Sequence, residues 1–247
     1  MTTSEDFISL GSSSIGGDLS EIVVAGAAGI DADELTASEV TLVTVLVDAS
    51  TSISTRGLED AIVRGYGDLV DAFSKAREKE GLLLALWTFN DEARVLHSYV
   101  PIDDAMRLDR GNYAALGGTK LYDTFCDALL ANVTYADRLR AAGTPTQSIL
   151  VVLTDGEDCG SRRRVAECRK LAKEALTTEA WQLAFVGVGT DVDFRKAAKS
   201  MGFPDGSVAV CENATPSSIR AIFRMVSQST IRASQARPGT RGGFFSP

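Results

Sequence analysis

The sequence is poor in the residues that most often carry zinc or covalent chemistry. It has one histidine, His97, and four cysteines in 247 residues, and no two cysteines form a Cys-x-x-Cys pair. The sequence therefore offers few ligands for a zinc site and few residues for a cysteine–histidine nucleophile. His97 lies on a segment of alternating polarity, where a lone histidine is expected at the surface. The cysteines, which we expect to be free thiols of a reducing compartment, are Cys126, Cys159, Cys168 and Cys211.

Long apolar runs and an excess of basic charge are also missing. No stretch approaches the roughly 18 apolar residues of a membrane span, and the acidic start, Met1 to Asp6, lacks the basic region of a secretory signal. We therefore expect a cytoplasmic protein without a membrane partner. The net charge is −8 and the pI is about 4.8, which argues against nucleic acid as a partner.

The pattern that is present alternates between buried strands and amphipathic helices. Apolar runs at 41–47, 82–89, 149–154 and 181–188, the first of them rich in β-branched residues, indicate buried strands, and residues 94–100 alternate like an antiparallel edge strand. The segments between the runs carry apolar residues at helical spacing. This order predicts an α/β fold with a doubly wound, mostly parallel sheet, one antiparallel edge strand and helices on both faces.

The composition also divides the chain into three parts. Residues 1–38, with a Ser/Gly-rich stretch, are expected to form a flexible or loosely docked extension with a short strand at 22–24. Residues 39–229 form the predicted domain. Residues 230–247 are rich in Ser, Gln, Arg, Pro and Gly, so we expect a disordered C-terminal tail.

Oxygen-bearing side chains follow the first buried strand at alternate positions. Asp48, Ser50 and Ser52 lie in an extended turn, where alternate residues point the same way and can converge. Such hard oxygens suit a hard cation such as Mg²⁺, Mn²⁺ or Ca²⁺. The alternative is purely structural: Asp48 ends the strand, and Ser52 or Ser54 caps the next helix.

Two further loops are expected at the same edge of the sheet, because parallel strands end there together. One follows the strand at 82–89, and another follows the strand at 149–154. The turn at 117–119 precedes a helix that runs back along the sheet, so Thr119 also lies at this edge. The side chains and turn residues that these loops contribute are Asn90, Asp91, Gly118, Thr119, Asp155, Glu157 and Asp158.

Three spaced motifs, taken together, resemble the signature of the von Willebrand factor type A domain. They are Asp48-x-Ser50-x-Ser52, Gly117-Gly118-Thr119-x-Leu121-Tyr122-Asp123 and Leu153-Thr154-Asp155-Gly156-Glu157-Asp158. The resemblance covers about residues 41–229 and, through Thr88-Phe89-Asn90-Asp91, is closest to bacterial intracellular members. It implies a Rossmann-like fold with a complete metal-ion-dependent adhesion site.

The resemblance also implies a ligand set and a mode of binding. Ser50, Ser52 and Thr119 would ligate the metal through hydroxyls, and Asp48 and Asp155 directly or through water. A protein partner would supply a carboxylate to the metal, as in stress-response or complex-assembly systems with an ATPase or chaperone-like partner. Thr51 departs from the glycine that many members carry. The expected partner-binding rim comprises Asn90, Asp91, Gly118, Glu157, Asp158, Arg162 and Arg163.

Two other functions are compatible with parts of the pattern. An aspartate after the first strand is also where some Mg²⁺-dependent phosphoryl-transfer hydrolases place a nucleophile, but Ser50 stands where those enzymes need a second acid. No complete phosphate-binding glycine motif is present. A metal-free scaffolding domain is the other alternative. We expect a binding module rather than an enzyme.

Overall fold

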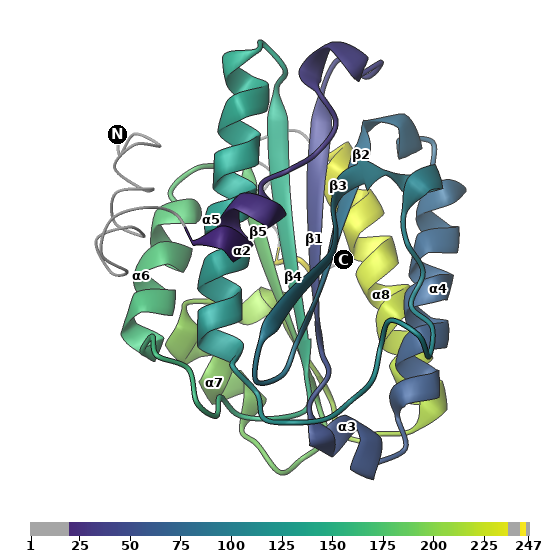
Figure 1. The fold of residues 1–247 in the computed structure, drawn as a ribbon, viewed down its shortest axis with the longest axis vertical. Coiled ribbons are helices and arrows are strands. Elements are labelled where there is room, and N and C mark those ends of the chain that lie inside the picture. The colour runs from purple at the N-terminus through teal and green to yellow at the C-terminus, as the bar shows by residue number, and fades with distance from the viewer. Residues whose placement is uncertain (1–19, 237–242, 246–247) are drawn as a thin grey trace.

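The computed structural model describes residues 20–236 and 243–245. Its centre is a six-stranded sheet with the strand order β3-β2-β1-β4-β5-β6 (Figure 1). Each neighbouring pair is parallel except β2 and β3, which pair antiparallel. The strands are β1 Val40–Asp48, β2 Leu82–Phe89, β3 Ala93–Pro101, β4 Thr146–Thr154, β5 Trp181–Val188 and β6 Val208–Cys211.

Burial explains why these runs form strands in this order. Every residue of β1 and β2 is buried, as expected for central parallel strands covered on both faces. The edge strands β3 and β6 are mostly half-buried. The predicted fold class, a doubly wound and mostly parallel sheet with one antiparallel edge strand, is confirmed.

Helices cover both faces of the sheet (Figure 1). One apolar cluster joins the sheet to α2, α5, α6 and α7, and the other joins it to α3, α4 and α8. The helices are α2 Glu21–Gly26, α3 Thr51–Thr55, α4 Glu59–Ser74, α5 Leu121–Ala141, α6 Val165–Ala175, α7 Phe194–Met201 and α8 Pro216–Gln235. Short 3₁₀ helices lie at Ala32–Glu34, Lys79–Gly81, Ile102–Asp104 and Asp205–Ser207.

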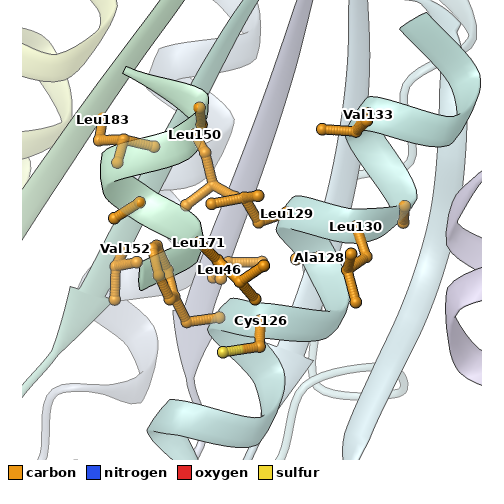
Figure 2. Packing of buried hydrophobic residues seen from close by; sticks show 14 of the residues in the cluster. Leu46, Cys126, Ala128, Leu129, Leu130, Val133, Leu150, Val152, Leu171 and Leu183 are labelled. Carbon is orange, nitrogen blue, oxygen red and sulfur yellow. The ribbon is translucent and has the colours of Figure 1, made fainter. Parts of the chain in front are cut away.

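The two faces of each strand serve different cores, because successive side chains point to opposite sides. Along β1, Leu42 and Leu46 pack beneath α5, whereas Val43, Val45 and Val47 pack beneath α4 and α8. Figure 2 shows the first of these cores, where side chains of β1, β4 and β5 meet those of α5 and α6. The labelled residues are Leu46, Cys126, Ala128, Leu129, Leu130, Val133, Leu150, Val152, Leu171 and Leu183.

The described part of the N-terminal segment, 20–38, differs from the expectation. The strand predicted at 22–24 is the helix α2, and this segment is packed on the sheet rather than loosely docked. Val23 is fully buried, and Ser98 of β3 donates a hydrogen bond to the carbonyl of Ala25. A β-carbon on Gly26 would lie 2.0 Å from the Trp87 ring, so a close tertiary contact outweighs the β-propensity of Ile22-Val23-Val24.

The C-terminal helix also runs past the predicted domain end at 229. It continues to Gln235, because Thr230 and Ala233 still face the core and are buried. Of the predicted tail, residues 243–245 are described and Phe244 is buried, whereas the positions 1–19, 237–242 and 246–247 lie outside the described residues. Among the described helices, none combines the length and apolarity that crossing a membrane requires.

Candidate metal centre

The sheet topology brings the two predicted aspartates to the same place. Asp48 ends β1 and Asp155 directly follows β4, and these two strands are parallel neighbours in the centre of the sheet. The chain leaves β1 towards β2 on one side, while β4 lies on the other, so strand order reverses between them. Ligands of open α/β sheets bind at such a reversal, outside the carboxyl ends of the strands.

The carboxylate of Asp48 is fully buried and is held at both oxygens. Its Oδ1 accepts a hydrogen bond from the Ser50 amide at 2.8 Å, and its Oδ2 accepts one from the Thr154 hydroxyl at 2.5 Å. Burial raises the pKa of Asp48 to about 6, although the hydrogen bonds from Ser50 and Thr154 oppose the shift. The role of Thr154 is not evident from the sequence, because a threonine at a strand end is a common strand residue.

Two hydroxyls and the second carboxylate form a compact group beside Asp48. The Oγ atoms of Ser50 and Ser52 are 3.0 Å apart. Oδ1 of Asp155 accepts from Ser52 at 2.6 Å and from Ser50 at 3.4 Å. Burial raises the pKa of Asp155, while the Ser52 hydroxyl and the nearby Arg56 guanidinium act in the opposite direction.

These contacts argue against the helix-capping alternative. Ser50 is the N-terminal cap residue of α3, but its side chain makes no capping hydrogen bond. The hydroxyl of Ser52 donates to Asp155 rather than to a backbone group, and Ser54 donates to the Thr51 carbonyl inside the same short helix. The hydroxyls of Ser50 and Ser52 are therefore directed at the carboxylate of another loop.

Thr119 joins this edge through its backbone. Its carbonyl accepts from the Cys159 amide at 2.7 Å, and the preceding Gly117, at φ +83°, accepts from the Thr51 amide at 3.1 Å. The Thr119 side chain is buried, and its hydroxyl lies 3.4 Å from the position of a β-carbon on Gly156. Among the described residues, no hydrogen bond connects this hydroxyl to the Ser50–Ser52–Asp155 group.

Most of the expected rim residues hold the loops in place. The Asn90 side chain donates to the Leu116 carbonyl at 2.8 Å, Asp91 accepts from the Gly118 amide at 3.0 Å, and Asp158 accepts from the Tyr122 amide at 2.9 Å. These bonds connect the three loops to one another. Glu157 is exposed.

Of the two arginines expected on the partner-binding rim, Arg163 does not face outward. Arg163 is paired with Asp127 at 2.8 Å, and its side chain is only 9% exposed. It also donates to the Asp123 carbonyl, so its guanidinium fastens the start of α6 to α5 instead of facing a partner. Arg162 is exposed. A run of three arginines does not reveal which of them finds an internal acid.

Arg56 also lies beside the site, although none of the sequence motifs includes it. Its Nε lies 3.6 Å from Oδ2 of Asp155. The available signal was its position one helical turn after Ser52, which places the two side chains on the same face of α3. Because Nε is beyond hydrogen-bond distance, Oδ2 of Asp155 is buried without a hydrogen-bond partner among the described residues.

The donor set fits a hard divalent cation. In the described part of the chain, no three His, Cys, Asp or Glu side chains gather to hold a metal, so any site here depends on hydroxyls as well as carboxylates. Asp155 offers a buried oxygen without a hydrogen bond, and Ser50 and Ser52 lie beside its other oxygen. Mg²⁺ prefers such oxygen ligands and keeps several waters.

Comparisons with solved structures identify the fold, whereas neither the known protein families nor the curated proteins contain a match. Proximal thread matrix protein 1 from the mussel byssus is similar over 82% of this chain, at 20% identity and TM-score 0.54. Another structure of that protein, with a zinc-occupied metal-ion-dependent adhesion site motif, is similar over 79% at 19% identity and TM-score 0.52. A von Willebrand factor type A protein from Catenulispora acidiphila is similar over 78% at 16% identity and TM-score 0.52.

The likeness covers only part of each of these proteins. The present chain spans 47%, 46% and 43% of their lengths. The likeness agrees with the fold that the three sequence motifs implied. The chain therefore has the fold of von Willebrand factor type A domains.

Proposed function

We propose that the chain is a metal-dependent protein-interaction module. Ser50, Ser52 and Thr119 would hold a divalent cation through their hydroxyls, and Asp48 and Asp155 would hold it directly or through water. The cation, Mg²⁺ in the simplest case, would supply an electrophilic position that accepts an Asp or Glu carboxylate of a partner protein. Cytoplasmic location remains a prediction from the sequence composition, and an ATPase or chaperone-like partner remains a prediction of the family resemblance.

The observation that carries this proposal is Oδ2 of Asp155, which is buried and accepts no hydrogen bond among the described residues. A buried carboxylate oxygen without a hydrogen bond is costly, and a bound cation is a common reason to keep one. The neighbouring hydroxyls of Ser50 and Ser52 supply further oxygens at 2.6–3.4 Å from the other oxygen of Asp155. The zinc-occupied motif of the mussel protein, which has the same fold, also supports a cation at this edge.

The contacts of Asp48 favour binding over phosphoryl transfer. A nucleophilic carboxylate needs an oxygen that a bulky phosphoryl group can approach, whereas a cation or its bound water needs far less space. Both oxygens of Asp48 accept hydrogen bonds and the side chain is fully buried. We therefore expect no hydrolysis of p-nitrophenyl phosphate or ATP above background. Turnover that disappears in Asp48→Asn would instead favour the hydrolase.

Calorimetric titration of the full chain with Mg²⁺ and Mn²⁺ tests the metal site. We expect one cation per chain for the wild type and at least about tenfold weaker binding for Thr119→Ala, because second-shell and ligand losses typically have effects of this size. Thr134→Ala is the matched control, since the Thr134 hydroxyl only donates to the Leu130 carbonyl within α5. No binding by the wild type would leave the metal-free scaffold as the better explanation.

Partner capture tests the second half of the proposal. Tagged full-length protein would be used to recover partners in Mg²⁺ and in EDTA, and each recovered protein would be tested again with Asp48→Asn. We expect recovery that depends on both Mg²⁺ and Asp48. Equal recovery by wild type and variant, or in EDTA, would contradict metal-mediated binding.

A further inference from the structure

Arg56 lies between the candidate metal centre and the loop after β5. Its Nε is 3.6 Å from Oδ2 of Asp155, and its Nη2 donates to Asp191 at 2.6 Å. Its Nη1 donates to the carbonyl of Val188, the last residue of β5, at 3.1 Å. The side chain is only 23% exposed, whereas that of Asp191 is 77% exposed. One guanidinium thus connects a buried acid of the centre to an exposed acid outside it.

The backbone of the turn after β5 leaves space for the Arg56 guanidinium. Gly189 has φ +107°, and a β-carbon there would lie 2.4 Å from Nη1 of Arg56. Only glycine adopts this conformation without strain and also leaves the space that the guanidinium fills. The position of Arg56 is therefore fixed from both sides, by α3 and by the turn after β5.

The charges give this position a consequence for the metal. Among the described residues, Arg56 is the one cationic side chain that forms an ion pair with Asp155, whose Oδ2 has no hydrogen bond there. A divalent cation on the same carboxylate would be repelled by the guanidinium, since like charges at short range oppose each other even when water screens them. The guanidinium of Arg56 also has a second acidic partner, Asp191, at hydrogen-bond distance.

We propose that Arg56 is a positioning residue that competes with the divalent cation for Asp155. In the metal-free protein its guanidinium compensates the buried carboxylate. When the cation binds, the metal balances the negative charge of Asp155 in place of Arg56, and Arg56 stays paired with Asp191. Arg56 thereby stabilises the metal-free protein and weakens cation binding. This inference rests on the proposed metal site.

Opposite signs in two measurements distinguish this role from a merely structural one. In Arg56→Gln the positive charge is lost, and the shorter side chain no longer reaches the Val188 carbonyl. We expect the metal-free variant to unfold at lower denaturant than the wild type, and yet to bind Mg²⁺ and Mn²⁺ on the order of tenfold more tightly. A residue that only braced the loops would, when lost, weaken both stability and metal binding.

Asp191→Asn gives a second test with an exposed residue, whose replacement leaves the fold intact. With the negative charge of its outer partner removed, the guanidinium is held less strongly outside the centre and is attracted more strongly to Asp155. We therefore expect Mg²⁺ to bind several-fold more weakly than to the wild type, opposite to Arg56→Gln. Glu179→Gln is the control for total charge, because Glu179 is exposed and precedes β5 at the other end of the sheet; its Mg²⁺ affinity should equal that of the wild type.

The experiment is calorimetric titration of the full-length proteins with MgCl₂ and MnCl₂, together with denaturant unfolding in EDTA. Arg56→Lys, which keeps the charge, should stay near the wild-type affinity. If the wild type binds Mg²⁺ and Arg56→Gln binds it equally or more weakly, the role of Arg56 is overturned but the metal site is not. If Arg56→Gln does not fold, an unchanged or tighter Mg²⁺ affinity in Asp191→Asn overturns it. The absence of binding by the wild type would overturn the proposed metal site as well.

Discussion

A single hydroxyl, that of Thr154, supplies the hydrogen bond to one oxygen of the buried Asp48 carboxylate. Thr154 is fully buried and its hydroxyl donates to Oδ2 of Asp48 at 2.5 Å. Valine has the same shape without the hydroxyl, so Thr154→Val would leave that oxygen without a donor. Because hydrogen bonds to charged groups are the strong ones, we expect the metal-free protein to lose about 2 kcal/mol of unfolding free energy, measured by urea denaturation at pH 7.

Thr88 offers a matched control for this change. It lies near the end of β2, on the other side of β1 from Thr154 and opposite Val47. It is also buried, but its hydroxyl has no hydrogen bond among the described residues. Thr88→Val should change the unfolding free energy by no more than about 0.5 kcal/mol. Equal losses in the two variants would mean that the Asp48 contact contributes nothing specific.

The chain's only histidine gives a residue-scale prediction about pH. His97 is half-buried on β3, its Nδ1 lies 2.9 Å from the Ser98 carbonyl, and its Nε2 is buried without a partner among the described residues. Burial lowers the pKa of His97 below its ordinary value of 6.5. The folded protein therefore favours the neutral ring, and below pH 6.5 the unfolded chain binds a proton that the folded chain does not.

It follows that stability contributed at His97 is present above pH 6.5 and is lost as the pH falls through the lowered pKa. Urea denaturation between pH 8 and pH 5 should show a steeper loss for the wild type than for His97→Gln, in which this group cannot titrate. A proton-NMR titration of the single imidazole would check the direction directly. A midpoint at or above 6.5 would show that burial does not control this ring.

At the scale of whole elements, the contact between α4 and α8 depends on one glycine. A β-carbon on Gly65 of α4 would lie 2.2 Å from the ring of Phe223 on α8, and both residues are buried. Gly65→Ala would force the two helices apart or the ring out of place. We expect a loss of about 1–3 kcal/mol, the usual cost of overpacking, measured by denaturant unfolding.

Gly67, on the same helix, should respond in the opposite direction. A β-carbon there would have ordinary contact, at 3.5 Å, with the end of the Arg107 side chain only. Since alanine favours the helix over glycine, Gly67→Ala should stabilise the protein by up to about 1 kcal/mol. If both alanines stabilised the protein equally, Gly65 would not be a packing residue.

The elements that could be predicted from the sequence are those with a strong periodic pattern or a continuous apolar run. The strand predicted at 82–89 coincides with β2, and the strand predicted at 41–47 lies within β1. The segment at 22–24 was mispredicted, because its local preference for a strand lost to the packing of Val23 and Gly26 against the molecule. The end of α8 was missed, because polar residues after Ser229 hide the two buried side chains Thr230 and Ala233.

At the scale of the whole molecule, topology explains why much of the candidate site was predictable. The rule that parallel strands end at one edge is enough to bring Asp48 and Asp155 together, and the structure adds direct hydrogen bonds from Ser50 and Ser52. The rule about strand ends does not predict which side chains of different loops pair with one another. The contacts of Arg56 with Asp155 and Asp191, and of Arg163 with Asp127, depend on how α3, α5 and α6 are placed, which periodicity does not specify.

The same topology predicts how a cation should affect the entire fold. A metal at this edge would connect the loops after β1 and β4 and the loop before α5, three segments that separate when the sheet unfolds. A ligand that binds only the folded state stabilises it by about 2.7 kcal/mol at a hundred times its dissociation constant. For a chain of this length, that corresponds to a rise in melting temperature of about 5–10 °C.

Thermal unfolding followed by circular dichroism, in EDTA and in saturating Mg²⁺, measures this rise. Asp48→Asn should be nearly insensitive to Mg²⁺, because the amide cannot supply the negative charge that holds the cation. Its melting temperature in EDTA is the necessary reference, since replacing a buried carboxylate by an amide also removes the cost of burying charge. The prediction therefore concerns the difference between Mg²⁺ and EDTA within each protein. A shift of the same size in wild type and variant would place the stabilising cation somewhere other than this edge of the sheet.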